Sequence, residues 1–237
     1  MSEQVIKNGD NMVYAIILSG GTGVRLGGNI PKQYIEVDGQ PIIADCIDTF
    51  EKCSVIDKYV IVAATEWEDY ILKYTGVKFD RFATPGENRQ LSIYSGLMAI
   101  KERTKDDDLA IIHDAARPFV TDAMINDLVN ACSKSDGAMP AIPVKDTMYI
   151  QEDGKVKSLI DRETLIAGQA PEAFLYRKYV MANEALLPDK ILDIKGSTEP
   201  AFIAGMDIAV VAGDENNFKI TTKEDLERYI QIKNNIN

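Results

Sequence analysis

Histidine is nearly absent from this chain, since His113 is the single one among its 237 residues. A metal centre built from several histidines is therefore excluded, as is a Ser-His-Asp triad that uses any other histidine. A triad with His113 would need a serine in a G-x-S-x-G elbow, and the sequence contains none. The three cysteines, Cys46, Cys53 and Cys132, form no C-x-x-C pair. They predict reduced thiols, with no zinc site and no disulfide framework.

Positive charge is also scarce, because 26 Lys and Arg residues stand against 37 Asp and Glu residues, for a formal net charge of −11. A broad nucleic-acid surface needs a basic face, so we expect no nucleic-acid partner, although a local Lys/Arg cluster can still bind a small anion. No apolar run reaches the roughly 18 residues that a membrane helix needs. The first residues, MSEQVIKNGDN, lack a signal peptide's apolar segment. We therefore expect a cytoplasmic protein without a membrane partner.

Apolar runs that alternate with helix-like segments indicate the fold. The runs typical of buried parallel strands cover 12–20, 58–64, 108–114 and, more weakly, 137–144. The helix-like segments between them cover 41–53, 66–74, 89–103 and 121–134. Thr121 is a candidate N-cap for the last of these helices. The pattern predicts one α/β domain over 1–237, with a doubly wound, mostly parallel sheet.

The pattern changes after the fourth apolar run. Residues 147–165, TMYIQEDGKVKSLIDRETL, predict two short strands around a turn at EDG. A hairpin this polar is expected to project from the body of the protein. Farther on, 171–186 looks helical, 206–214 looks like a strand, and a final helix is capped by Thr221 or Thr222.

A glycine-rich loop, LSGGTGVRLGGNIPKQY (18–34), directly follows the first apolar run. It fits neither of the two best-known glycine loops. Asn29 stands where a Walker loop needs lysine, and Leu26 stands where the dinucleotide fingerprint needs glycine. Glycines let backbone N–H groups approach an anion, Arg25 can grip a phosphate through two parallel hydrogen bonds, and Lys32 adds a mobile charge. A triphosphate would use all three, whereas the alternative is a tight turn with solvated charges.

Later segments add polar residues at similar places. PGENRQLSI puts Gly86, Arg89 and Ser92 before a helix-like run, as a second candidate nucleotide contact. HDAARPF puts Asp114 directly past a buried strand, where ligands of open α/β sheets bind, so Asp114 is a candidate metal ligand. Lys219, in NNFKITTKEDL, is flanked by apolar residues in a short extended stretch. Charges are seldom buried unpaired, so the alternative for Lys219 is an exposed head on a buried stem.

Taken in order, these segments resemble the CTP-dependent cytidylyltransferases of polyol phosphates, which include the 2-C-methyl-D-erythritol 4-phosphate and ribitol-5-phosphate cytidylyltransferases. The segments that carry the resemblance are SGGTGVRLGGNIPKQ, PGENRQLSI, HDAARPF, PVKDT, DRETL, QAPEAF and NFKITTKEDL, spread over 12–232. The resemblance implies a Rossmann-like nucleotidyltransferase fold that transfers CMP from CTP to a polyol phosphate and releases pyrophosphate. It also implies Mg²⁺ as cofactor and a homodimer formed through a β-arm at about 145–165.

The resemblance further implies roles for single residues. The nucleotide site would comprise Gly20, Gly21, Thr22, Gly23, Arg25, Lys32, Gly86, Arg89, Ser92, Asp114 and Ala115. Asp114 would also hold the metal. The polyol phosphate would contact Arg117 and two arm residues, Thr147 and Arg162, which reach the partner subunit's site. The residues implied in catalysis are Arg25, Lys32, Arg162 and Lys219. The acceptor is already an anionic phosphate, so no general base is needed.

Two segments depart from the pattern of the methylerythritol enzymes. These enzymes usually carry a Thr-Asp pair before the last strand, where this chain reads KGSTEPAF (195–202), and their usual Gln-Thr-Pro-Gln appears here as QAPE (169–172). The acceptor is therefore left open between methylerythritol 4-phosphate, ribitol 5-phosphate and another phosphorylated polyol or sugar. Two further alternatives are a sugar-phosphate nucleotidyltransferase that uses another nucleotide, and a catalytically impaired paralogue that binds nucleotide.

Overall fold

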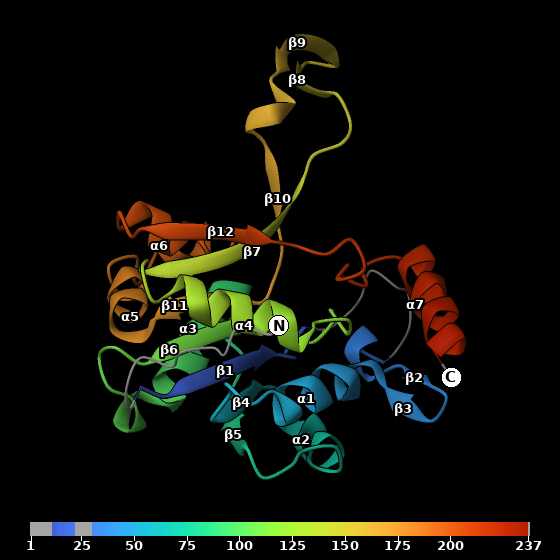
Figure 1. The fold of residues 1–237 in the computed structure, drawn as a ribbon, viewed down its shortest axis with the longest axis vertical. Helices are drawn as coiled ribbons and strands as arrows, with labels where there is room; N and C mark the ends of the chain where they lie inside the picture. Colours follow the sequence, from blue (N-terminus) through green and yellow to red (C-terminus); the bar gives the residue numbers. More distant parts are fainter. Residues whose placement is uncertain (1–10, 22–29, 237) are drawn as a thin grey trace, which may run out of the picture.

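The fold is built around one large mixed sheet. The structure is a computed structural model that describes residues 11–21 and 30–236. The strands of the main sheet are β1 (Val13–Leu18), β4 (Lys58–Val62), β5 (Phe79–Ala83), β6 (Leu109–Asp114), β7 (Gly137–Pro143), β10 (Ile166–Gly168), β11 (Glu172–Leu175) and β12 (Ile208–Ala212). They follow the order β10-β7-β11-β6-β1-β4-β5, and β12 pairs with β7 (Figure 1).

The four strands predicted from apolar runs are all present, and three of them form the parallel centre of the sheet. β1 pairs in parallel with β4 on one side and with β6 on the other. These strands are almost entirely buried, which explains why their sequences are continuous apolar runs. β7 lies farther out, where it pairs with β12 in parallel and with β10 and β11 in antiparallel. The predicted α/β fold with a largely parallel sheet is confirmed.

The helix predicted over 171–186 is wrong in its first part. Glu172–Leu175 form β11, which runs antiparallel to β6, and the helix α5 covers only Tyr176–Glu184. Ala173 and Phe174 are fully buried between β6 and β7, so pairing within the sheet outweighs the local helix preference. The strands β5 and β10 were not predicted either, because β5 (FDRFA) contains two charged residues and β10 (IAG) has only three residues.

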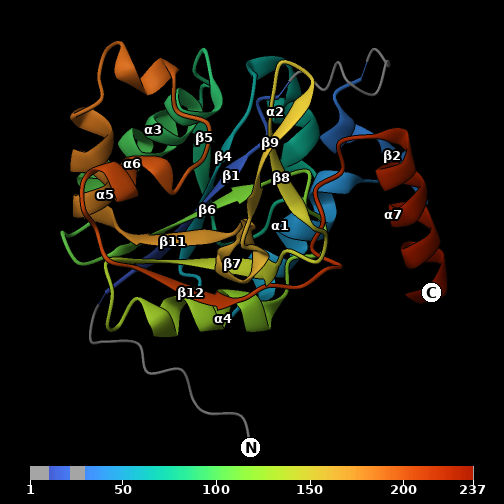
Figure 2. The same ribbon diagram turned by 90° about the horizontal axis from the view of Figure 1, so that it is seen from above.

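Helices cover both faces of the sheet. They are α1 (Ile42–Lys52), α2 (Thr65–Leu72), α3 (Arg89–Ala99), α4 (Asp122–Ala131), α5, α6 (Glu199–Ile203) and α7 (Lys223–Ile236). Ala15 and Ile17 of β1 pack in one apolar cluster with α1 and α4, whereas Tyr14 and Ile16 pack in a second cluster with α3 and α5. Figure 2 shows α3 and α4 on opposite sides of the sheet. Thr121 caps α4, as predicted.

Shorter elements connect these layers. They are β2 (Glu36–Val37), β3 (Gln40–Pro41) and the 3-10 helices η2 (Lys32–Tyr34), η3 (Lys101–Arg103), η4 (Arg162–Thr164) and η5 (Lys190–Leu192). The last helix, α7, follows Thr222, whose hydroxyl accepts a hydrogen bond from the amide of Asp225. On α1, Asp45 binds both Tyr229 and Lys233 of α7. These contacts fix the position of the chain directly before α7.

Two expectations from composition concern the whole fold. Cys46, Cys53 and Cys132 are free and buried, and burial raises the pKa of each thiol well above its ordinary value. Among the described residues, we find no helix with the length and apolar character needed to cross a bilayer.

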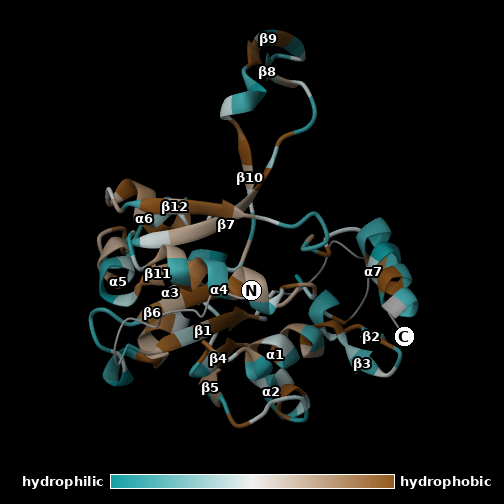
Figure 3. Cartoon of the chain, viewed as in Figure 1, coloured by the Kyte–Doolittle hydropathy of each residue, from teal (hydrophilic) through white to brown (hydrophobic). Residues whose placement is uncertain are grey.

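A hairpin arm projects from the body between β7 and β10. It consists of β8 (Met148–Glu152) and β9 (Lys155–Ile160), which pair in antiparallel. Asp153 and Gly154 form its two-residue turn, both with positive φ, as Asp-Gly turns of hairpins require. Nearly every residue of the two strands is exposed, and Figure 3 colours parts of this isolated element as hydrophobic. The predicted projecting arm is confirmed.

Candidate active site

A cavity of about 580 Å³ opens where β1 and β6 end. Leu18 and Asp114, the last residues of these neighbouring strands, are partners in the register of the sheet. From β1 the chain continues outward to β4 and β5, and it then returns to β6 on the other side of β1. The cavity therefore lies at the switch point of the sheet, where open α/β folds bind ligands. Its lining includes Gly20, Gly21, Lys32, Gln33, Gly86, Glu87, Asn88, Arg89, Ser92, Asp114, Ala116 and Lys219.

Polar contacts within the first segment fix the start of the glycine loop. The side-chain amide of Gln33 donates hydrogen bonds to the carbonyl oxygens of Ser19 (2.7 Å) and Gly21 (2.8 Å). The hydroxyl of Tyr34 bonds to the same Ser19 carbonyl. At Gly20, an added Cβ would lie 2.5 Å from the Pro85 ring, so only glycine fits there. Sequence analysis named the PKQ segment but missed the role of Gln33.

Three of the predicted phosphate-loop residues, Thr22, Gly23 and Arg25, lie outside the described residues. Their predicted roles stay predictions. Lys32 lines the cavity and donates a hydrogen bond to the carbonyl oxygen of Ile220. This contact brings the first loop next to the chain that carries Lys219.

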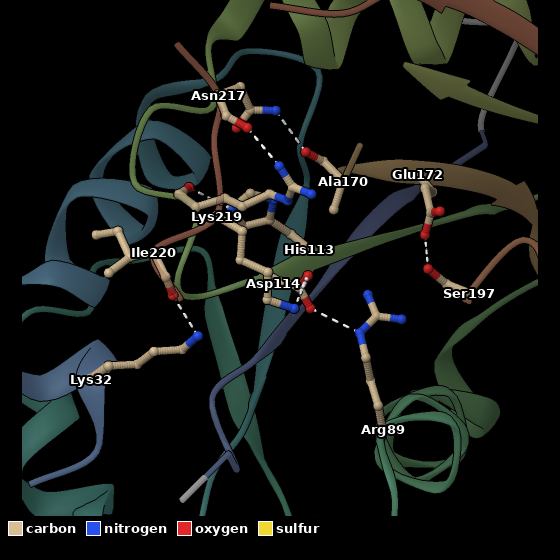
Figure 4. A network of polar contacts seen from close by, with 11 residues as sticks. Lys32, Arg89, His113, Asp114, Ala170, Glu172, Ser197, Asn217, Lys219 and Ile220 are labelled. Atoms are coloured by element: carbon tan, nitrogen blue, oxygen red, sulfur yellow. Dashed lines mark hydrogen bonds and ion pairs between the residues drawn. The ribbon is translucent and has the colours of Figure 1, made fainter. Parts of the chain in front are cut away.

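Asp114 is held between two cations (Figure 4). Its carboxylate oxygens accept from Nε of Arg89 at 3.0 Å and from Nζ of Lys219 at 2.9 Å. Burial alone would raise the pKa of Asp114, but the two cations outweigh it and hold this pKa well below its ordinary value. Asp114 is therefore anionic at neutral pH. Lys219 points into the site, so the alternative of a solvent-directed lysine is wrong.

The cavity carries a local excess of positive charge. Lys32, Arg89 and Lys219 all line it, and among its described lining residues only Asp114 and Glu87 are acidic. In a cavity with low-dielectric walls such an excess attracts anions, even in a chain whose net charge is −11. The site is suited to a ligand with several negative charges, such as a triphosphate.

The site was also tested for a fit to Mg²⁺. Among the described residues, no group of three His, Cys, Asp or Glu side chains could hold a metal by itself. Mg²⁺ commonly binds through one or two carboxylates, and substrate phosphates supply further ligands. Asp114 is anionic and lines the cavity, so it fits the part of a single protein ligand.

Arg117 lies near the site but is not among the cavity-lining residues. Its guanidinium donates to the carbonyl oxygen of Asn217 at 2.6 Å, and its own carbonyl oxygen accepts from Nε2 of His113 at 3.1 Å. The buried side-chain amide of Asn217 donates in turn to the carbonyl oxygen of Ala170. In this chain Arg117 therefore fixes the segment before Lys219. Burial lowers the pKa of His113 to about 4. The His113 ring is therefore neutral at pH 7 and adds no positive charge beside the Arg117 guanidinium.

The remaining predicted residues fall into two groups. Ser92 and Ala115 stabilise loops at the cavity: the Ser92 hydroxyl accepts from the amide of Gly86, and the amide of Ala115 donates to the carbonyl oxygen of Leu18. Thr147 and Arg162 lie on the arm, where both are exposed and outside the cavity lining. Within a single chain, the structure does not bring these two arm residues to the cavity.

Sequence analysis missed one buried acid beside the site. The carboxylate of Glu172 accepts from the hydroxyls of Ser197 and Thr198 (2.9 Å for Thr198). Burial is the largest influence on its pKa, which is raised to about 7 despite the opposing effects of Arg89 and Thr198. The motif QAPE contained this residue, but a glutamate at the start of an expected helix gives no sign of burial.

The fold and the cavity together define a class of protein. At its switch point an open α/β sheet carries Gly20 and Gly21, the three cations Lys32, Arg89 and Lys219, and Asp114, which binds two of these cations. This is the arrangement of an α/β enzyme that binds a nucleotide through its phosphates.

Comparisons with known proteins identify the family. The sequence profile of IspD, 2-C-methyl-D-erythritol 4-phosphate cytidylyltransferase, matches residues 13–232. The enzyme of that name from Geobacter metallireducens is 34% identical over 232 residues, which cover 93% of this chain and 98% of the relative. Ribitol-5-phosphate cytidylyltransferase from Streptococcus agalactiae serotype III is 29% identical over 220 residues, which cover 90% and 92%.

Solved structures agree with this assignment. The 4-diphosphocytidyl-2C-methyl-D-erythritol synthase of Anaerococcus prevotii superposes with a TM-score of 0.81 at 25% identity, over 94% of this chain and 99% of that chain. The Francisella tularensis 2-C-methyl-D-erythritol 4-phosphate cytidylyltransferase gives a TM-score of 0.80 at 27% identity, over 92% and 98%. The chain belongs to the IspD family of cytidylyltransferases. It is a CTP-dependent nucleotidyltransferase.

Removal of either cavity lysine is expected to abolish turnover. Lys32→Ala and Lys219→Ala should each lower kcat/KM by about 100- to 1,000-fold, because each removes a preplaced positive charge from the site of phosphoryl transfer. Release of pyrophosphate from CTP measures the effect, and circular dichroism checks that the fold is intact. Lys223→Ala, which removes the same charge from an exposed position on α7, is the matched control. Near-normal rates in both cavity variants would contradict these roles.

The raised pKa of Glu172 predicts a pH-dependent stability. Between its ordinary value of 4.5 and about 7, the folded protein binds more protons at this site than the unfolded chain. The contribution to the free energy of unfolding is therefore present below pH 4.5 and is lost as the pH rises through 7. Glu172→Gln removes this pH-dependent loss. As the pH rises from 4.5 to 7, the free energy of unfolding of the variant should therefore increase relative to that of the unaltered protein, by up to about 3 kcal/mol.

Urea unfolding of both proteins at several pH values measures this difference. The comparison is needed because His113, whose pKa is lowered to about 4, changes stability in the opposite direction over part of the window. Both proteins contain His113, so its contribution cancels. Parallel stability curves for the two proteins would contradict the prediction.

Proposed function

We propose that this enzyme transfers CMP from CTP to 2-C-methyl-D-erythritol 4-phosphate and releases pyrophosphate. The observation that carries the proposal is the cavity at the switch point of the sheet, where Arg89 and Lys219 bind Asp114 and Lys32 adds a third cation, in a chain that matches the family profile over 13–232. Relatives support this choice of acceptor, since those at 34%, 34% and 32% identity bear the name of this activity.

The chemistry needs charge stabilisation rather than a base. A phosphate oxygen of the acceptor, already anionic at neutral pH, forms a bond to the α-phosphorus of CTP, and the bond from that phosphorus to the bridging oxygen of pyrophosphate breaks. Lys32, Lys219 and Arg89 offset the repulsion between the two anions and stabilise the charge that develops. Arg25 of the glycine loop is proposed to act with them. His113 is buried and neutral, in agreement with a reaction that needs no general base.

Mg²⁺ is proposed as the cofactor, with Asp114 as its protein ligand. When bound with the nucleotide, the ion would neutralise phosphate charge. Asp114 is already anionic and is oriented by Arg89 and Lys219, so it needs no proton loss to take this part. We place the enzyme in the cytoplasm, where its substrate CTP is made.

A homodimer formed through the arm is proposed to complete the site. The arm exposes large apolar side chains, including Tyr149 (55%), Val156 (69%) and Leu159 (65%), which a second subunit would cover. Thr147 and Arg162 lie on the same arm and are proposed to bind the acceptor phosphate in the partner subunit's cavity. Arg162 is held by a hydrogen bond to the carbonyl oxygen of Lys145.

Ribitol 5-phosphate is a second candidate acceptor. Relatives named for that activity match over 90% of this chain at 29% identity. Ala170 and Glu172 stand where the methylerythritol enzymes usually carry Thr and Gln, so the acceptor half of the site differs from their pattern.

An acceptor assay tests the proposed function. Pyrophosphate release from CTP should be fastest with 2-C-methyl-D-erythritol 4-phosphate, and UTP, GTP and ATP should replace CTP poorly. Faster turnover with ribitol 5-phosphate would assign the second acceptor instead. CTP binding without turnover of either acceptor would indicate an impaired paralogue, and the proposed function would then be wrong.

A mixing experiment tests the shared site. Arg162→Ala should inactivate the acceptor side and Lys219→Ala the nucleotide side, so each homodimer should be inactive. If the arm of one subunit serves the cavity of the other, one of the two sites in a mixed dimer contains both native residues. Co-refolded subunits should therefore regain a part of the normal rate, while light scattering should report dimers for both variants. No recovery in mixed dimers would show that each chain works alone.

A further inference from the structure

The two places where the sequence departs from the methylerythritol pattern lie in contact with each other. Glu172 belongs to β11, whereas Ser197 and Thr198 directly precede α6, more than twenty residues later. One carboxylate oxygen of Glu172 accepts from the Ser197 hydroxyl and the other from the Thr198 hydroxyl. The contact is buried, since Glu172 is 7% and Ser197 2% exposed. The two departures therefore form one polar contact.

This contact lies beside Arg89 of the cavity. In Figure 4 the guanidinium of Arg89 lies between the Asp114 carboxylate and the Glu172–Ser197 pair. Burial tends to lower the pKa of Arg89, but Asp114 and then Glu172 raise it, and their combined effect prevails. Two carboxyl groups thus face Arg89, the anionic Asp114, which accepts its hydrogen bond, and Glu172, which is partly ionised at neutral pH.

The same cluster is tied to the helix that carries Arg89. The neighbouring residue, Gln90, donates to Asn183 (2.6 Å) and Tyr179 (3.1 Å) of α5. The hydroxyl of Tyr179 donates to the carbonyl oxygen of Ser197 at 2.7 Å. The first turn of α3, the helix α5 and the segment before α6 therefore share one buried polar network, and Glu172 supplies its carboxyl group.

We infer that Glu172 is a positioning residue for the nucleotide site. It fastens the segment before α6 to β11 through Ser197 and Thr198, and its negative charge orients the guanidinium of Arg89 in the cavity. Glu172 does not line the cavity itself, so its effect on the nucleotide passes through Arg89. The inference rests on the proposed function, because it requires CTP to bind in this cavity.

The inference also accounts for the two departures together. The family's usual pattern has a neutral Gln at the position of Glu172 and a carboxylate in the Thr-Asp pair of the later segment. This chain has a carboxylate on β11 and two hydroxyl donors in the later segment. The carboxylate and its two donors therefore come from the two departing segments and satisfy each other across one buried contact.

The sign of the change in CTP affinity tests the inference. If Glu172 acted only as a nearby negative charge, its removal would favour the anionic nucleotide and tighten binding. If it positions Arg89, Glu172→Gln should weaken binding, by about tenfold in Kd. Isothermal titration of the full-length protein with CTP and Mg²⁺ measures this directly, without turnover. Asp108→Asn is the matched control, because Asp108 is equally buried but lies at the start of β6, away from the cavity.

A double variant tests the exchange of charge. Thr198→Asp alone should weaken CTP binding further, because it puts two carboxylates against each other in a buried site. Glu172→Gln with Thr198→Asp returns to a single charge, and it should bind CTP within about threefold of the unaltered protein. Equal or tighter binding by Glu172→Gln, or a double variant weaker than that single variant, would overturn the inference. Absence of CTP binding by the unaltered protein would instead overturn the proposed function, and the inference with it.

Discussion

The cavity depends on the contacts of Asp114 with Arg89 and Lys219. One carboxylate at the end of β6 joins the first residue of α3 to the segment that leads into α7. Without this carboxylate, Arg89 and Lys219 would lie close together in a partly buried site with no compensating charge, which is costly. Without the two cations, a buried Asp114 would tend to become protonated. Asp114 and the two cations therefore lower the free-energy cost of burying one another. Together they bring distant parts of the sequence to one place.

Two parts of the scaffold hold these charges in position. The segment before Lys219 is fixed by Arg117 and by Asn217, whose side-chain amide donates to the carbonyl oxygen of Ala170, two residues before β11. Glu172, the first residue of β11, approaches Arg89 from the side opposite to Asp114. The antiparallel strand β11 is thus more than an extension of the sheet. It lies beside β6, its first residue Glu172 approaches Arg89, and the chain just before it binds the Asn217 side chain, two residues from Lys219.

Much of this arrangement could be predicted from the sequence, and the reason is local. β1, β4 and β6 are continuous apolar runs because both of their faces are covered, and Asp114 was recognised because it directly follows such a run. Lys219 was recognised by its apolar neighbours. The arm was recognised by its alternation and by the Asp-Gly turn. In each case a few adjacent residues contain the whole signal.

What the sequence did not reveal depends on contacts between distant residues. β11 was expected to be helical because its pairing with β6 cannot be read from four residues, and Glu172 was consequently not expected to be buried. Its partners, Ser197 and Thr198, were noticed only because the segment 195–202 lacks the Thr-Asp pair of the methylerythritol enzymes. The role of Arg117 at the acceptor stays a prediction, but its hydrogen bond to the carbonyl oxygen of Asn217, a hundred residues later, could not be read from the sequence. Such roles become visible only when the fold has brought the segments together.

The burial of Glu172 is informative because it is costly. A glutamate whose pKa is raised to about 7 lowers the stability of the folded chain at neutral pH, and a neutral side chain of the same shape would avoid that cost. A buried position that served only the stability of the fold would not need such a residue. Binding sites, in contrast, often contain charged groups that lower the stability of the folded protein. The cost is reduced here by two hydroxyl donors and by the field of Arg89. Since Ser197 and Thr198 come from the other segment that departs from the methylerythritol pattern, the two departing segments form one satisfied polar contact beside Arg89.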